Sequence, residues 1–134
     1  MTRRVILHLL ILAAVLLLIP VASVSAHGEP DEWVEQQIEE AAEEFEQSVA
    51  ELRAVLHCES AHWDPAVIYG PRRGLAGEEG IAQFLGGAQH PFWQDSPWSE
   101  YSPDDPAAAI RVMAWHWERD PETKWQWSCW RSGA

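Results

Sequence analysis

The chain has few basic residues, and this shortage excludes two classes of partner. Nine Lys and Arg residues face 21 Asp and Glu residues, which gives a net charge of −12 at pH 7. Nucleic acids and anionic membranes repel such a protein, so binding to either of them through charge is excluded. Polyanionic wall polymers repel it too. Any affinity for a cell wall is therefore expected to come from contacts with neutral sugars.

Long hydrophobic runs are also scarce, and the clearest one lies at the start of the chain. Two arginines precede an apolar stretch at residues 5–19, a proline follows it, and Val24-Ser25-Ala26 has the small residues of a cleavage site. The stretch is shorter than the roughly 20 residues of a spanning helix. Residues 1–26 are therefore predicted to be a signal peptide, with an uncleaved anchor as the alternative. We expect a secreted, extracytoplasmic protein of the periplasm or cell wall, without an integral membrane domain once the signal is removed.

Cysteine is nearly absent, and both cysteines, Cys58 and Cys129, lie in the part that would be exported. Outside the cytosol an even pair favours a disulfide. Closing a loop of about 70 residues stabilises a chain by roughly 3–4 kcal/mol in the chain-entropy model. The alternatives are two free thiols or a thiol nucleophile at Cys58.

Residues 31–58 have the apolar spacing of a helix, in two seven-residue series. Ten of the acidic residues lie between positions 29 and 53, so the outer face is almost wholly Glu. The pattern allows one long helix, or an acidic stalk leading into a core helix near Val49. A solvated amphipathic face is favoured over a coiled-coil dimer, so a monomer is expected. We place an acidic helical extension at 27–48 and a compact domain at 49–134.

The rest of the chain has one more clear helix. Asp105-Pro106 supplies a cap and a first-turn proline, and Asp120-Pro121 ends the helix. Its predicted buried face is Ala107, Ile110, Met113, Ala114 and Trp117, whereas Arg111, Glu118 and Arg119 are predicted to be exposed. Residues 60–79 and 90–103 are predicted to be irregular. No repeat or strong strand pattern occurs, so the fold class is mainly α.

Glu59 is the first candidate for chemistry. The preceding turn, Val55-Leu56-His57, and the downstream Trp63 can supply an apolar wall around it. Burial raises the pKa of a carboxyl because it disfavours the charged form, and a carboxylic acid kept neutral can protonate a glycosidic oxygen. Local composition alone fits an ordinary exposed Glu at a helix end equally well.

An ordered set of motifs follows Glu59-Ser60. It comprises Trp63-Asp64-Pro65-Ala66-Val67, Gly80-Ile81-Ala82-Gln83, the helix at 106–115 and the tail Trp127-Ser128-Cys129. Over about 75 residues, Val55 to Trp130, this set resembles the soluble lytic transglycosylases and the related goose-type lysozymes. The tail is similar to the terminal Trp-x-Cys of their short secreted and phage-borne members.

The resemblance implies a small lysozyme-like domain that needs no cofactor. It would cleave the β-1,4 bond between N-acetylmuramic acid and N-acetylglucosamine in peptidoglycan glycan strands. Glu59 takes the role of catalytic acid, and Ser60 steadies it by hydrogen bonding. Gln83 and the backbone of Ile81 and Ala82 line the cleft.

The resemblance leaves open which nucleophile follows the acid. In lytic transglycosylases the muramoyl 6-hydroxyl attacks, and no second carboxylate is needed. A hydrolytic lysozyme needs a base to position water, and Glu78, Glu79 and Asp95 are the candidates.

The third motif departs from the family pattern. Ala109 stands where an Asn is usual, and the tyrosine position falls among Trp115, His116 and Trp117. His116 could replace the hydrogen bond that the tyrosine makes to the acid. A non-catalytic module of the same fold, binding glycan or a protein partner, is therefore an alternative. An inhibitor or structural secreted protein is a third class.

The chain has nine tryptophans, whose flat faces can stack on sugars. Trp93 and Trp98 are the candidates for sugar contact, because they lie in the irregular segment where a cleft loop belongs. No metal site is predicted. His57 and His62 lack the spacing of two ligands one helical turn apart. A copper site at His27, the new N-terminus after cleavage, would need a β-sandwich that nothing here indicates.

Overall fold

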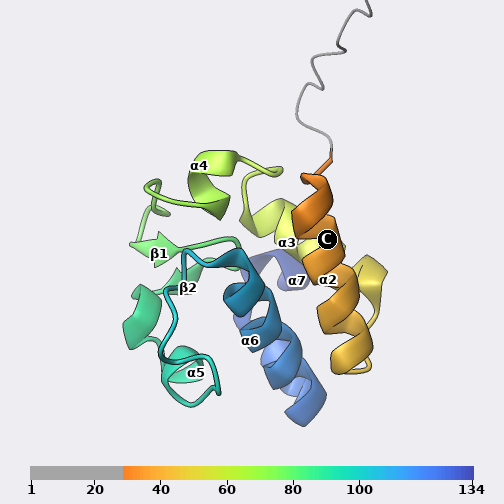
Figure 1. Cartoon of the computed structure of the whole chain (residues 1–134). Coiled ribbons are helices and arrows are strands. Elements are labelled where there is room, and N and C mark those ends of the chain that lie inside the picture. Colours follow the sequence, from red (N-terminus) through yellow and green to blue (C-terminus); the bar gives the residue numbers. More distant parts are fainter. Residues whose placement is uncertain (1–28) are drawn as a thin grey trace, which may run out of the picture.

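The computed structural model describes residues 29–134, and over this range the protein is mainly helical (Figure 1). The predicted signal peptide at 1–26 and His27 lie outside the described residues. From position 29 to the end, no helix is long and apolar enough to cross a membrane.

Two helices form the first part of the fold: α2 (Glu32–Glu44) and α3 (Val49–Glu59). The Asp31 carboxylate caps α2 by accepting a hydrogen bond from the Val34 amide at 2.9 Å. The chain then turns at Glu46, whose φ is 50°, and the Ser48 hydroxyl caps α3. The alternative of one long helix over residues 31–58 is therefore wrong. The chain forms two helices, and the second, α3, begins at Val49, where the other alternative placed the core helix.

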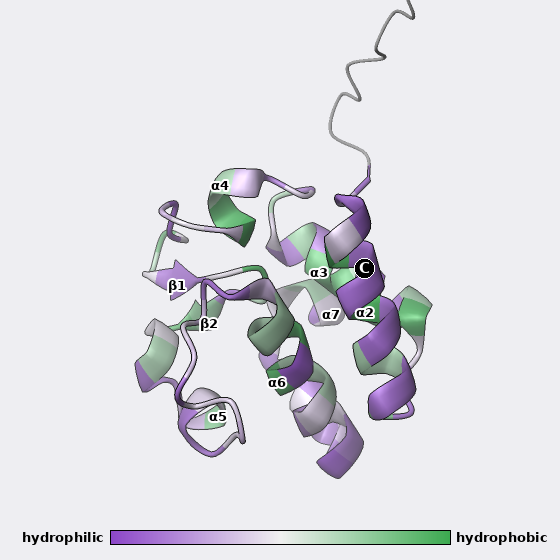
Figure 2. Ribbon diagram, in the orientation of Figure 1, coloured by the Kyte–Doolittle hydropathy of each residue, from purple (hydrophilic) through white to green (hydrophobic). Residues whose placement is uncertain are grey.

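Helix α2 packs against α6 (Pro106–Arg119) and shares its core. Val34, Ile38 and Ala41 of α2 are fully buried. Figure 2 shows that much of the α2 ribbon is strongly hydrophilic, as expected for a helix with a Glu-rich outer face. An amphipathic helix buries its apolar stripe against a neighbour. Residues 29–48 therefore belong to the same body as the rest of the described chain and do not project from it as a stalk.

Helix α6 has the bounds predicted for it. The Asp105 carboxylate accepts hydrogen bonds from the amides of Ala107 and Ala108 at 3.0 and 3.2 Å, and the helix ends before Asp120. Most of its predicted face is buried, with Ala107 only partly so. The prediction that Arg111 is exposed is wrong. Its side chain is only 19% exposed because it lies between α6 and α2.

Short elements complete the fold. They are α4 (Pro65–Ile68), β1 (Glu78–Glu79), β2 (Phe84–Leu85), η1 (Gly87–Gln89), α5 (Pro91–Gln94), η2 (Pro121–Gln126) and α7 (Ser128–Arg131). The strands pair antiparallel, with Glu78 opposite Leu85 and Glu79 opposite Phe84. The sequence did not predict this hairpin, because two residues per strand are too few to set a period.

The disulfide between Cys58 and Cys129 is confirmed. It joins the last turn of α3 to α7 across 71 residues of sequence and leaves no free cysteine in the part of the chain described. The link brings the C-terminal segment beside Glu59.

Candidate active site

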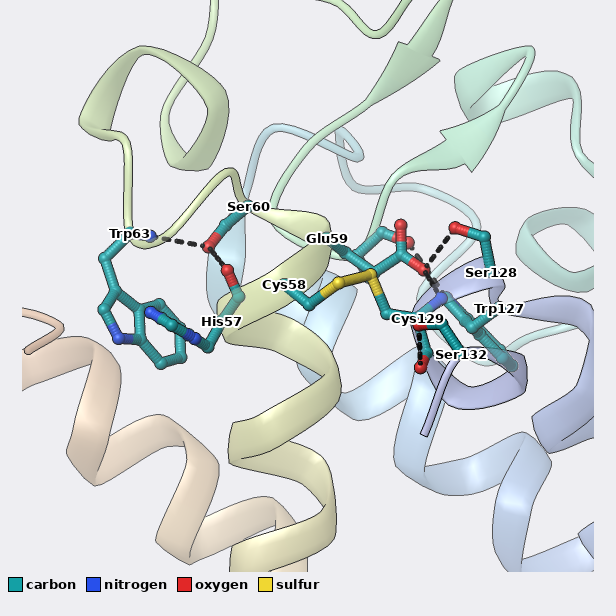
Figure 3. The surroundings of a disulfide bond; sticks show 10 residues. His57, Cys58, Glu59, Ser60, Trp63, Trp127, Ser128, Cys129 and Ser132 are labelled. Atoms are coloured by element: carbon teal, nitrogen blue, oxygen red, sulfur yellow. Dashed lines mark hydrogen bonds between the residues drawn. A yellow bond between two sulfur atoms is a disulfide. The ribbon is translucent and has the colours of Figure 1, made fainter. Parts of the chain in front are cut away.

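Glu59 is the last residue of α3, and its carboxyl group lies against the start of α7. Its Oε1 accepts a hydrogen bond from the Cys129 amide at 3.0 Å and another from the Ser128 hydroxyl at 3.2 Å (Figure 3). Both donors are neutral. The disulfide fixes this arrangement, because Cys58 precedes Glu59 and Cys129 is itself one of the donors.

The surroundings raise the pKa of Glu59 above its ordinary value. Burial is the largest cause, because it disfavours the charged carboxylate, and the nearby charge of Glu78 adds to it. The hydrogen bonds from Cys129 and Ser128 and the positive charge of Arg131 act in the opposite direction. Burial wins, so the carboxyl group keeps its proton to a higher pH than an exposed Glu does.

Glu59 opens onto a cleft of about 280 Å³. The other lining residues come from the hairpin, from the segment around α5 and from the C-terminal segment: Glu78, Gln83, Phe84, Leu85, His90, Phe92, Gln126, Trp127, Ser128 and Arg131. Aromatic rings beside polar side chains suit a ligand with flat apolar faces and a polar rim, such as a sugar ring. A protonated carboxyl in such a cleft can act as a general acid.

Gln83 lies in the cleft, as the sequence predicted, and a tight turn holds it there. Its φ is 50°, and its side-chain amide donates to the Gly80 carbonyl at 2.8 Å. Gly80 itself has a φ of 72°, and a Cβ at this position would lie 1.8 Å from the Pro103 carbonyl oxygen. Only glycine fits so close to another backbone segment.

Ile81 and Ala82 do not line the cleft, contrary to the expectation for their backbone. Both are fully buried. The Ala82 carbonyl accepts a hydrogen bond from the Trp127 indole nitrogen at 2.9 Å, so that group is already used. This bond ties the turn before β2 to the C-terminal segment.

Ser60 does not bond to Glu59, contrary to the expected role. Figure 3 shows the two side chains turned to opposite sides of the helix end. The Ser60 hydroxyl is buried, donates to the His57 carbonyl at 3.3 Å and accepts from the Trp63 amide at 3.0 Å.

Ser60 instead holds the turn that ends α3. Ala61, His62 and Trp63 have φ values of 54°, 63° and 64°, in the left-handed region that side chains disfavour. The Ser60 hydroxyl and carbonyl hold this turn through the amides of Trp63 and Asp64. The turn fixes where the helix stops, and thereby where Glu59 lies.

Trp93 is a core residue, Trp98 is partly buried and packs against the core, and neither lines the cleft. Trp93 is fully buried, and its indole nitrogen donates to the Tyr101 carbonyl at 3.2 Å. Trp98 packs edge-on against Phe45, with ring centroids 5.8 Å apart. The segment predicted to be irregular therefore contains the short helix α5 and packs over the core. The aromatic rings in the cleft lining are Phe84, Phe92 and Trp127, together with the His90 imidazole.

His116 does not contact Glu59. Its Nε2 lies 2.8 Å from the Phe92 carbonyl oxygen, and its ring stacks on Phe92 with centroids 4.2 Å apart. His116 therefore supports the cleft wall through Phe92 and does not replace the missing tyrosine hydroxyl. Burial lowers the pKa of both His116 and His90.

Of the three candidates for a second carboxylate, only Glu78 lines the cleft with Glu59. Its Oε2 accepts a hydrogen bond from the Ala76 amide at 2.9 Å. Glu79 faces Arg73 at 3.5 Å, and Asp95 is exposed at the end of α5.

Sequence reasoning missed several cleft residues, including His90, Phe92, Ser128 and Arg131. Ser128 could have been found, because a Cys58–Cys129 bond places the neighbours of Cys129 beside Glu59. The others had no such signal.

The two histidines beside Glu59 in the sequence, His57 and His62, stack on each other with ring centroids 4.7 Å apart. Within residues 29–134 no group of three His, Cys, Asp or Glu is placed to hold a metal ion.

Comparison with known proteins gave no match: no family model fits the chain, and no curated protein or solved structure is significantly similar to it. What the cleft does must therefore be inferred from its own residues.

Proposed function

We propose that this protein is a secreted, lysozyme-like lytic transglycosylase that cleaves the β-1,4 bond between N-acetylmuramic acid and N-acetylglucosamine. The observation that carries the proposal is the position of Glu59, a partly buried carboxyl with a raised pKa in a polar cleft with aromatic walls. The ordered motifs of the sequence support the same assignment. The disulfide fits an extracytoplasmic location.

Glu59 is the general acid. Its carboxyl proton passes to the glycosidic oxygen as the bond from that oxygen to the anomeric carbon breaks. The muramoyl 6-hydroxyl then forms a bond to the same carbon and returns its proton to Glu59, which leaves a 1,6-anhydro sugar. The hydrogen bonds from Ser128 and Cys129 stabilise the carboxylate between the two proton transfers.

The remaining lining residues bind and orient the glycan. Phe92, which is partly exposed, offers apolar surface to sugar rings, and Gln83 can hydrogen-bond an acetamido group. Because the only described carboxylate that shares the cleft with Glu59 is Glu78, a hydrolytic lysozyme in which Glu78 positions water is the second candidate. The two candidates differ in their products.

The test is Glu59→Gln, with Glu118→Gln as the matched control. The amide of E59Q keeps an oxygen that can accept from Cys129 and Ser128, so the fold is retained, but it has no acidic proton. We expect cleavage of purified wall to fall at least about a hundredfold in E59Q. Glu118 is exposed near the end of α6, outside the cleft, and E118Q should cleave normally.

Mass spectrometry of the digest identifies the reaction. Anhydro-muropeptides indicate transglycosylation, and reducing ends indicate hydrolysis with Glu78 as the next residue to replace. Full activity of E59Q would end the enzyme proposal. Retention of the unmodified protein on wall without any product would favour the non-catalytic binding module.

A further inference from the structure

Arg131 differs from nearly every other basic residue that the structure describes. Five of the seven basic residues in 29–134 form ion pairs with carboxylates: Arg53, Arg72, Arg73, Arg111 and Lys124. Arg119 and Arg131 form none with the residues described. The Arg119 guanidinium lies 4.5 Å from the centre of the Trp115 ring. Arg131 lines the cleft.

One nitrogen of the Arg131 guanidinium forms a hydrogen bond, and its other donors have no partner among the residues described. Its Nη1 donates to the Trp125 carbonyl at 2.8 Å, which fixes the side chain without neutralising its charge. Its Nε and Nη2 form no hydrogen bond with residues 29–134. A guanidinium has five N–H donors in a planar fork, and this fork matches a carboxylate. In a chain with 21 acidic residues, this exposed guanidinium lies in the cleft without an ion pair to any residue described, although its charge acts on Glu59.

The cleft would otherwise repel an anion. Glu78 lines it, Glu59 adds a second negative charge whenever it is deprotonated, and no Lys or Arg other than Arg131 lines it among the residues described. A muramic acid residue carries a lactyl group, whose carboxyl is either free or joined to a peptide stem that bears carboxylates of its own. A cleft that accepts such a strand needs a cation where the anion lies.

We propose that Arg131 is a binding subsite for a carboxylate on the muramic acid residue of the substrate, either the free lactyl carboxylate or one on the peptide stem. The assignment rests on the proposed function. It makes Arg131 a residue that determines specificity and not a catalytic one. It also amends the expectation from composition, because one wall contact is then ionic and not with a neutral sugar group.

The test measures binding in the Glu59→Gln background, where strands are not cleaved. The ligands are glycan strands with intact stems, strands stripped of stems by an amidase, and stripped strands whose lactyl carboxyl has been coupled to methylamine. We expect E59Q to bind at least one carboxylate-bearing strand about three- to tenfold more tightly than the methylamide. The tighter of the first two identifies the source of the carboxylate.

Arg131→Gln should abolish this discrimination, and Arg119→Gln should preserve it. Both variants remove one positive charge, so a difference between them excludes a general effect of net charge. Arg131→Lys keeps the charge without the fork and should retain part of the discrimination, which provides a second variant if R131Q folds poorly.

The outcomes separate the two proposals. If all three ligands bind E59Q equally, or if R119Q loses discrimination as R131Q does, the assignment of Arg131 is wrong and the glycan proposal stands. If no strand binds at all, the proposed function fails, and the subsite fails with it.

Discussion

The contact between α2 and α6 and the cleft at the end of α3 use the same kinds of side chain in opposite ways. At the first, Arg111 is largely buried and pairs with Glu40 at 3.1 Å and with Glu44 at 3.3 Å, and it donates to Gln37 at 2.9 Å. Hydrogen bonds from Gln36 and Arg111 lower the pKa of Glu40. In the cleft, Glu59 has neutral donors at hydrogen-bond distance, and burial raises its pKa.

The difference separates acids that hold the fold together from the acid proposed as the proton donor. A carboxylate paired with a guanidinium stays charged and joins two helices. A carboxyl that is buried beside neutral donors keeps a proton that it can transfer. Composition alone, with its 21 acidic residues, cannot separate the two kinds, because the partner decides.

The largest effect on stability should come from removing the disulfide. In Cys58→Ala/Cys129→Ala the unfolded chain regains the freedom of the 71-residue loop, so the free energy of unfolding should fall by about 4 kcal/mol. Because α7 is then less firmly held against α3, Glu59 becomes less buried and its pKa should fall towards the ordinary value. Chemical denaturation measures the first change, and a carbon-13 NMR titration of the Glu59 carboxyl measures the second.

The same titration contains its own control. Glu40 lies on α2, away from the disulfide, and its pKa should stay low in the double variant. A Glu59 titration that the double variant leaves unchanged would show that the disulfide stabilises the fold without positioning the acid.

A smaller effect should come from the other region. Arg111→Met keeps most of the side-chain volume but removes the donor to Gln37, which is itself buried, so the free energy of unfolding should fall by about 1–2 kcal/mol. The pKa of Glu40 should rise, whereas that of Glu59 should not change. R111M lacks the cation that offsets the repulsion among the Glu side chains of α2. Because salt screens this repulsion, high salt should raise the stability of R111M more than that of the wild type. Unfolding curves at two salt concentrations test this, and an equal response would contradict it.

Two kinds of feature could be predicted from the sequence: helix ends, which depend on nearby residues, and the disulfide, for which only one pairing of cysteines exists. The cap at Asp105 and the stop at Asp120 define α6 because each acts on its own helix end. With two cysteines in a segment predicted to be exported, only one pairing was available. Glu59 was identified through the ordered motifs. The apolar wall expected from Val55-Leu56-His57 and Trp63 does not line its cleft; the carboxyl lies against Ser128 and Cys129, and burial there raises its pKa.

Side-chain direction could not be predicted. Ser60 adjoins Glu59 in sequence, yet a left-handed turn sends its hydroxyl the other way. Trp93 lies in the short helix α5, within the segment predicted to be irregular, and is buried, whereas its neighbour Phe92 lines the cleft instead. Such choices depend on packing between segments far apart in the chain, and no local period records them.

The smallest expected effect concerns how stability changes with pH in the wild type and in E59Q. The folded-state pKa of Glu59 lies above its unfolded value, so folding favours the protonated carboxyl. Below the unfolded pKa both states are protonated, and the wild type has its full stability relative to E59Q. As pH rises from there through the folded pKa the wild type loses stability, whereas the amide of E59Q does not titrate.

The melting temperature of the wild type, relative to E59Q, should therefore fall over this range and then level off. The fall should be modest, because the bonds from Ser128 and Cys129 offset part of the burial cost. A wild type that gains stability over E59Q as pH rises would mean that Glu59 is held as an anion, like Glu40, and cannot serve as the acid.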